Sequence, residues 1–178
     1  IGVCHLYMAK FDSYTTSDLM SYIAIGTDDR IYAIAELIRR GMDISLIESA
    51  TKIDMLFIEK IKNVVAMENT LKANVGCLDT LKAAKKMGFA DKYIAKLWKV
   101  KERDVAALRA QKSIKPVFRM VDTLHAGAYI PYFYSSYSGK NDSVLTDKKK
   151  AVVLGAGPIR IGQGVEFDYS TVHAVSTI

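Results

Sequence analysis

Cysteine and histidine are scarce in this chain, and their scarcity excludes several classes of site. Two cysteines, Cys4 and Cys77, lie far apart among 178 residues, and three histidines, His5, His125 and His173, are scattered without the spacing of metal ligands. We therefore expect no disulfide framework, no metal centre and no histidine-based catalytic triad. Free thiols of this kind are typical of a protein in the reducing cytoplasm.

Long apolar runs are absent as well. The chain has no stretch of about 18 apolar residues, and it does not open with a basic segment followed by an apolar one. The sequence therefore predicts no membrane span and no signal peptide, and it favours a cytoplasmic protein without a membrane partner. Its first residue is Ile1 rather than methionine, and we interpret the chain as an internal piece of a longer protein.

What the chain has in excess is positive charge. The net charge is +6, and a local excess of cations lies between Lys82 and Arg103. Eight cationic side chains in that stretch accompany two carboxylates, those of Asp91 and Glu102. Such a patch fits nucleic acid, an acidic partner or plain solvent.

Short helices are predicted one after another from about residue 17 to residue 112. Apolar residues recur at helical spacing in each, Asp43 and Asp54 are suited to begin helices, and Gly41 and Gly88 are suited to end them. The main expected helices cover residues 31–38, 44–50, 54–71, 78–84, 93–98 and 103–108. Because 50% of the residues are hydrophobic, the chain can bury a core of ordinary size.

An internal repeat is visible when the sequence is shifted by 47 positions. Like residues then coincide in the same order along two units of helix, glycine, short helix, turn and helix. The coinciding pairs are Gly41 with Gly88, Met42 with Phe89, Ile47 with Ile94, Lys52 with Lys99, Ile53 with Val100, Ile58 with Val105, Ile61 with Leu108, and Lys62 with Arg109. Each unit could bury one apolar stripe against the other, so we predict a mainly α fold built from a duplicated array of short helices.

The pattern changes after residue 111. Residues 116–121 alternate as in a strand, and the aromatic segment 129–137 is expected to be extended, with Pro131 suited to an edge or an unpaired strip. We interpret the tyrosines of this segment as a seam that holds it against the helices; a base-stacking strip is the other interpretation. Residues 138–150 are expected to form a solvated linker.

The most informative stretch follows the linker. An apolar run at 151–154 predicts the first β-strand of an α/β domain, and a glycine-rich turn and the start of a helix come after it. Glycines free backbone N–H groups beside a helix N-terminus, an arrangement that binds phosphate or carboxylate. The candidate residues of this anion-binding turn are Gly155, Gly157, Arg160, Gly162 and Gly164.

This turn does not match the two commonest nucleotide motifs. Arg160 stands where the third glycine of a dinucleotide fingerprint belongs, and Gly164 is not followed by the lysine and hydroxyl residue of a P-loop. Nicotinamide binding and Walker-type binding are therefore not favoured. A purely structural tight turn is the alternative to a ligand site, and Arg160 could equally pair with Glu166 or Asp168.

Several motifs together resemble the middle of the large subunit of carbamoyl phosphate synthase. The most specific is the run from Gly157 to Tyr169. Weaker motifs precede it in the family's order, at residues 29–32, 40–42, 51–54, 57–58, 88–91, 94–97, 116–117, 121–123 and 134–137. The likeness covers nearly the whole chain. One departure lies at 124–129, which lacks the acidic residue that the family often has there.

This resemblance implies a domain organisation. Residues 1–27 would be an N-terminal connecting segment, residues 28–145 a helical oligomerisation domain with an extended aromatic strip, and residues 146–178 the start of the pre-ATP-grasp domain of the carbamoyl-phosphate half. The family's ATP-binding residues and metal carboxylates lie outside this stretch. We therefore carry over no catalytic residue and no metal ligand, and we expect the chain alone to be inactive.

The resemblance also implies the chemistry and the partners of the parent enzyme. It would be a ligase that uses ATP, with Mg²⁺ or Mn²⁺, to make carbamoyl phosphate from bicarbonate and glutamine-derived ammonia, for arginine or pyrimidine biosynthesis. The implied partners are the remainder of the large subunit, a glutaminase small subunit and further copies of the same subunit.

Residues 91–109 support a different hypothesis, a helix-turn-helix nucleic-acid-binding domain with a basic second half. The apolar positions of this stretch are those that any helical hairpin needs, and the first copy of the repeat is nearly neutral. We therefore favour a connector and oligomerisation module, and we expect no nucleic-acid partner.

Overall fold

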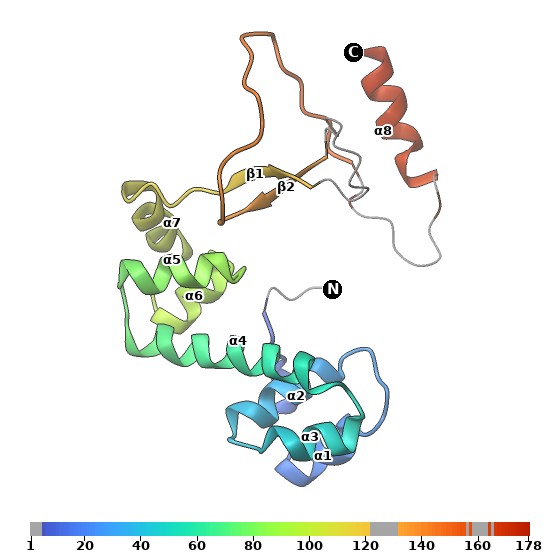
Figure 1. The fold of residues 1–178 in the computed structure, drawn as a ribbon, viewed down its shortest axis with the longest axis vertical. Helices are drawn as coiled ribbons and strands as arrows, with labels where there is room; N and C mark the ends of the chain where they lie inside the picture. The colour runs from blue at the N-terminus through green and yellow to red at the C-terminus, as the bar shows by residue number, and fades with distance from the viewer. Residues whose placement is uncertain (1–4, 122–131, 156, 158–163, 165) are drawn as a thin grey trace. The chain divides into compact units, whose positions relative to one another are not determined.

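The computed structural model of the chain describes residues 5–121, 132–155, 157, 164 and 166–178 (Figure 1). It divides into two compact units, Ile1–Ser143 and Val144–Ile178, each of which is described by itself. In the described part of the chain, no helix is long and apolar enough to cross a membrane.

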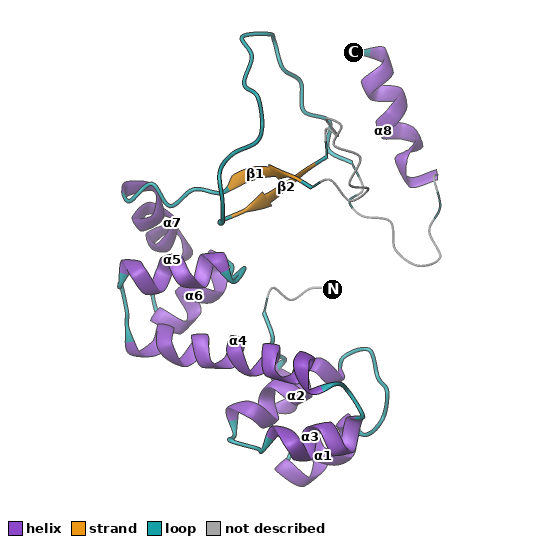
Figure 2. Ribbon diagram, viewed as in Figure 1, coloured by secondary structure: helices purple, strands orange, loops and turns teal. Residues whose placement is uncertain are grey.

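The first unit is built mainly of helices, as the periodicity predicted (Figure 2). A short 3-10 turn, Ala9–Phe11, precedes α1. The helices are α1 Thr16–Ile23, α2 Arg30–Arg39, α3 Ile44–Thr51, α4 Met55–Ala73, α5 Leu78–Lys86, α6 Asp91–Trp98 and α7 Glu102–Gln111. Helix α1 lies in the stretch that the sequence assigned to a connecting segment, and its Leu19 and Ile23 are fully buried.

The predicted caps are confirmed. The Asp43 side chain accepts a hydrogen bond from the backbone N–H of Ser45 at 2.9 Å, and the Asp54 side chain accepts one from Leu56 at 2.8 Å. These bonds satisfy backbone donors that the first turn of a helix leaves without a partner. The positions of α3 and α4 therefore follow from local sequence.

The duplication is confirmed in the backbone. Gly41 and Gly88 both have positive φ, 81° and 89°, where they end α2 and α5. The bond from Met42 N–H to Leu37 C=O has its counterpart in the bond from Phe89 N–H to Ala84 C=O, and both are 3.0 Å long. Each is the six-to-one bond of a Schellman helix ending. Helices α2, α3 and the start of α4 thus form one unit, which we call the first repeat, and α5, α6 and α7 form its copy, the second repeat.

Two apolar clusters hold the helices together. The first contains Ile34, Leu37, Ile47 and Ile58, and the second contains their counterparts Leu81, Ala84, Ile94 and Val105 together with Leu71. Helix α4 contributes Ile58 to the first cluster and Leu71 to the second, so this one long helix connects the two repeats (Figure 1).

A two-stranded antiparallel sheet follows α7. Strand β1, Val117–Met120, pairs with β2, Phe133–Ser136, with Val117 opposite Ser136. Both segments were predicted to be extended. Pro131 and Tyr129 lie outside the described residues. Asn141 and Asp142 of the following segment accept backbone N–H bonds from Phe118 and Met120 at 2.9 and 3.0 Å, which fastens the predicted linker to β1.

In the second unit the expected helix is present and the expected strand is not. Helix α8, Glu166–Thr177, follows the glycine-rich turn. Residues 151–155 are in no strand, and Val152 and Leu154 are 84% and 90% exposed. A strand needs a neighbour to pair with its backbone, and the described residues of this unit include no other strand. The strand predicted at 151–154 is therefore wrong for this chain, although its apolar composition is suited to one.

Candidate functional site at the junction of the two repeats

The predicted anion-binding turn is described only in part. Gly157 has a φ of 87°, a conformation that side chains with a Cβ rarely adopt. A Cβ added to Gly155 would lie 3.4 Å from Oγ1 of Thr171 on α8. Gly164 is half-buried, and Arg160 and Gly162 lie outside the described residues. The conformation at Gly157 accounts for a glycine at that position, and anion binding by the turn stays a prediction.

A different constellation, which the sequence did not predict, lies where the two repeats meet. Glu68 of α4 is only 1% exposed. Its two carboxylate oxygens accept hydrogen bonds from Nε and Nη2 of Arg39, on α2, at 2.8 and 2.9 Å. A bidentate pair of this kind is the geometry in which arginine holds a carboxylate most firmly. The Arg39 guanidinium also donates to the backbone carbonyl of Leu6 and contacts Glu36.

Tyr93 of α6 completes this network from the second repeat. Burial raises the pKa of the Tyr93 phenol, and the neighbouring Glu68 carboxylate raises it further. The phenol therefore stays protonated and can act as a donor at neutral pH. Residues from α2, α4 and α6 thus meet around one buried carboxylate, and we call Arg39, Glu68 and Tyr93 the junction network.

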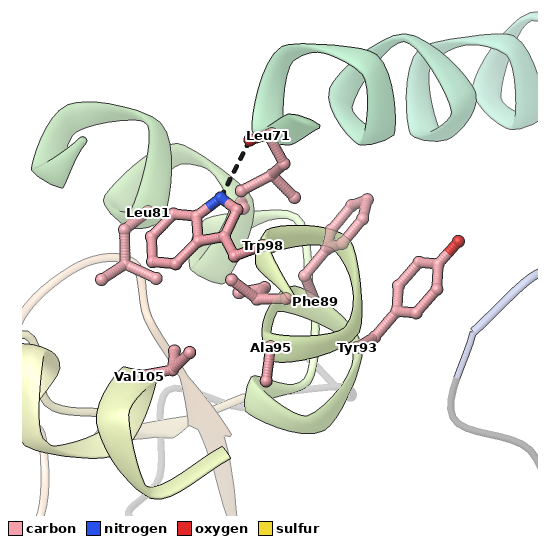
Figure 3. Packing of buried hydrophobic residues seen from close by; sticks show 9 residues of the cluster. Leu71, Leu81, Phe89, Tyr93, Ala95, Trp98 and Val105 are labelled. Carbon is pink, nitrogen blue, oxygen red and sulfur yellow. Dashed lines mark hydrogen bonds between the residues drawn. The ribbon is translucent and has the colours of Figure 1, made fainter. Parts of the chain in front are cut away.

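The indole of Trp98 makes a second link between α4 and α6. Its Nε1 donates a hydrogen bond of 2.9 Å to the carbonyl of Leu71, a residue in the last turn of α4 (Figure 3). Figure 3 shows the ring of Trp98 lying among Leu71, Leu81 and Phe89. The Leu71 carbonyl also accepts a longer bond, 3.3 Å, from the backbone N–H of Asn74, so the indole supplies a second and shorter bond at the end of α4 and links α6 to it.

A cavity of about 740 Å³ opens beside the junction network. Three exposed lysines, Lys72, Lys96 and Lys99, line it together with Glu68 and Tyr93. The Lys96 ammonium lies 3.9 Å from the centre of the Tyr7 ring. The lining combines the ion pairs of Arg39 with Glu36 and Glu68 and several aromatic rings, so the cavity offers charged and aromatic contacts.

The N-terminal segment passes over this junction. The rings of His5 and Tyr93 lie with their centres 4.0 Å apart. Burial lowers the pKa of the His5 imidazole. His5 therefore packs against Tyr93 as one aromatic ring against another. His173 contacts Tyr169 on α8 at 4.3 Å between ring centres, and His125 lies outside the described residues.

The second repeat carries an ion triad that includes one lysine of the basic patch, for which the sequence left nucleic acid, an acidic partner and solvent open. Asp91 accepts a bond of 2.8 Å from Nζ of Lys85 and bonds of 2.9 and 2.5 Å from Nε and Nη2 of Arg109. Lys85 also donates to the carbonyl of Phe89 at 2.7 Å. The only signal available in the sequence was the position of Asp91, an isolated acid among many cations.

Tyr137 lies against this triad from the segment after β2. Its ring centre is 4.8 Å from Nζ of Lys85 and 5.7 Å from the guanidinium carbon of Arg109. Such contacts place the negative face of a ring on a cation. The interpretation of the aromatic segment as a seam holds for Tyr137, while Tyr132 and Tyr134 are exposed.

The contacts of α6 and α7 bear on the helix-turn-helix hypothesis. Helices α6 and α7 do form a helical pair, and their Ile94, Trp98 and Val105 are buried in the second cluster. Lys85 and Arg109 are held by Asp91 and are not available to phosphates. In the described part of the chain, no group of three or more histidine, cysteine, aspartate or glutamate side chains is arranged to hold a metal ion.

Comparison with known families agrees with the order of these elements. Residues 1–113 match the family model of the carbamoyl-phosphate synthetase large chain, oligomerisation domain. Residues 147–178 match the model of the carbamoyl phosphate synthase preATP-grasp domain. The first match spans the helical array from its N-terminal segment to the end of α7, and the second spans the glycine-rich turn and α8. The chain therefore belongs to the carbamoyl-phosphate synthetase large-chain family.

Proposed function

We propose that this chain serves as the interdomain connector and oligomerisation module of a carbamoyl phosphate synthase large subunit and is not itself catalytic. The observation that carries the proposal is the order of the two family matches, with an oligomerisation domain at 1–113 and a preATP-grasp domain at 147–178. A connector between two catalytic halves is the arrangement that this order suggests.

The junction network supports the proposal physically. A connector has to hold its own helices in fixed positions, because relative movement of those helices would uncouple the two domains that it joins. Arg39, Glu68 and Tyr93 tie both repeats to α4 through a carboxylate that is buried, and the bond from Trp98 to Leu71 ties α6 to the same helix. Breaking a buried pair leaves an uncompensated charge, which makes such a junction resistant to opening.

To the parent enzyme we assign the ATP-dependent synthesis of carbamoyl phosphate from bicarbonate and glutamine-derived ammonia. Other parts of the large subunit would hold ATP and Mg²⁺ or Mn²⁺. The described residues here have no acidic cluster suited to a metal ion, so we assign no step with that ion to this chain. A glutaminase small subunit would be the source of ammonia, and the cytoplasm the location. The glycine-rich turn would supply one wall of an anion site that other residues complete.

Steady-state assays with ATP, bicarbonate and ammonia test the proposal. The purified chain is expected to release no phosphate and no carbamoyl phosphate above the buffer control. Turnover by the wild-type chain that is lost in an Arg160→Ala variant would contradict a non-catalytic role.

A titration against random DNA duplexes at physiological salt tests the alternative function, nucleic-acid binding by the helix-turn-helix. We expect weak binding without sequence preference, and we expect the affinity to fall further as salt is raised.

A further inference from the structure

The two repeats differ sharply in what they expose at one pair of equivalent positions. At the start of α4, Leu56 and Phe57 are 54% and 62% exposed. A shift of 47 positions brings them onto Arg103 and Asp104 at the start of α7, whose side chains are 77% and 56% exposed. The same place in the same structural unit is therefore charged in one copy and apolar in the other.

The second repeat shows which residue types the fold tolerates at the positions of Leu56 and Phe57. Each pair follows a left-handed lysine, Lys52 or Lys99, that ends the preceding short helix. Neither pair is needed for the core, because the inward-facing residues that follow, Ile58 and Val105, fill that role in both copies. The fold tolerates charged residues at these positions in the second repeat. The exposed leucine and phenylalanine of the first repeat are therefore best explained by a partner that covers them.

The charges around Leu56 and Phe57 indicate what kind of partner fits. Lys52, Asp54, Glu59 and Lys60 are all exposed, which gives two cations and two anions. When two identical surfaces meet around a two-fold axis, each surface meets a copy of itself, so a balanced set can pair cation with anion. The corresponding ends of α6 and α7 carry Lys99, Lys101 and Arg103 against Glu102 and Asp104, so cations and anions are not balanced there.

We propose that two copies of this chain associate through the first turn of α4, with Leu56 and Phe57 of each copy buried against the other. This inference rests on the proposed function and names its surface. A second copy is the occupant because the family model that spans this turn describes an oligomerisation domain and because the flanking charges are self-complementary. Apolar anchors within a rim of paired charges are the usual anatomy of such an interface.

The test uses sedimentation velocity on the full 178-residue chain over a concentration series. The variant Leu56→Arg/Phe57→Asp installs the residues that the second repeat has at the same place, so its helical content by circular dichroism should equal that of the wild type. We expect its dimer dissociation constant to rise about tenfold or more. The matched control is Val75→Asp, which changes a comparably exposed apolar residue beyond the other end of α4.

A second pair of variants keeps the test decisive if the first one folds poorly. Glu59→Lys and Lys60→Glu should each weaken self-association, and the double exchange should restore it. If the wild type self-associates and neither set of variants alters it, this surface is wrong while the oligomerisation module stands. If the wild type stays monomeric at every concentration while fully folded, both the surface and self-association of this chain are overturned.

Discussion

Lys52 and Lys99, which coincide in the two repeats, have the same left-handed backbone conformation, with φ of 58° at both. Each is the residue that ends a short helix, α3 or α6, before the chain enters the next one. The left-handed conformation costs a residue with a Cβ about 1–2 kcal/mol relative to the right-handed one. Two copies of the fold therefore keep the same strained turn, and both use lysine where glycine would relieve the strain.

Replacing either lysine by glycine is expected to stabilise the chain. Lys52→Gly and Lys99→Gly should each raise the free energy of unfolding by about 0.5–1 kcal/mol, because the relief of left-handed strain exceeds the added entropy of an unfolded glycine. Urea unfolding followed by circular dichroism measures the change. Lys62→Gly, at an exposed position in the interior of α4, is the control and should lower stability by about 1 kcal/mol. A loss of stability in both glycine variants would mean that the lysine side chains, not the backbone, decide these positions.

The reverse substitution at the helix-ending glycines is expected to destabilise. Gly41 and Gly88 have φ of 81° and 89°, and an added Cβ would meet no atom within 4 Å at either position. The cost of Gly41→Ala or Gly88→Ala is therefore purely conformational, and each should lower the free energy of unfolding by about 1 kcal/mol or more. Gly26→Ala is the matched control: its φ is not in the left-handed region and the nearest atom to its Cβ is 4.0 Å away. Equal effects at Gly26 and Gly41 would contradict this reason.

The features that could be predicted from sequence are those that local residues determine. Asp43, Asp54 and Gly41 act on backbone groups within a few residues, so the helix boundaries that they set were predictable. The repeat was predictable because pairs such as Ile47 and Ile94 occupy the same buried place in both copies.

The junction network and the ion triad could not be predicted, because their partners lie on different helices and meet only when those helices pack. Glu68 looks like any polar residue on a long helix until α2 brings Arg39 to it, and Lys85 looks solvated until Asp91 and Tyr137 cover it. The strand at 151–154 failed for the opposite reason: its composition favours a strand, but pairing depends on a neighbour that the described residues do not include.

Removal of the Glu68 carboxylate is expected to be the most damaging single change in the first unit. Glu68→Ala leaves the half-buried Arg39 guanidinium without its bidentate acceptor, and the free energy of unfolding should fall by about 3 kcal/mol. Asn63→Ala, on an exposed part of the same helix, should change it by about 0.5 kcal/mol or less. Urea unfolding of both variants and of Arg39→Met/Glu68→Leu separates charge from packing. The double variant should have a higher free energy of unfolding than Glu68→Ala. A lower free energy of unfolding in the double variant would show that the pair stabilises the chain mainly through the packing of its side chains.

The ion triad predicts a pH dependence that Asp91 should account for. Burial, the largest influence, raises the pKa of the Asp91 carboxyl, but the hydrogen bonds from Arg109 and Lys85 outweigh it and the pKa lies below the ordinary value of 3.8. A carboxyl whose pKa is lower in the folded state binds protons more readily when unfolded. Its stabilising effect is therefore complete above pH 3.8 and is lost as the pH falls through the lower, folded-state pKa.

Asp91→Asn tests this directly, because the amide has the shape of the carboxyl but cannot ionise. Near neutral pH the variant should be less stable than the wild type by roughly 2–3 kcal/mol, since Lys85 and Arg109 lose their common counter-charge. The difference should begin to shrink as the pH falls below about 4, where the unfolded wild-type carboxyl takes up a proton, and it should be lost once the pH passes the lower pKa of the folded carboxyl. Urea unfolding between neutral pH and the acid limit of the folded chain measures it, with exposed Asp147→Asn as the control. A stability gap that is the same at every pH would mean that Asp91 acts through its hydrogen-bond geometry alone, and the contact of Tyr137 with the two cations would then have to be explained without a charged triad.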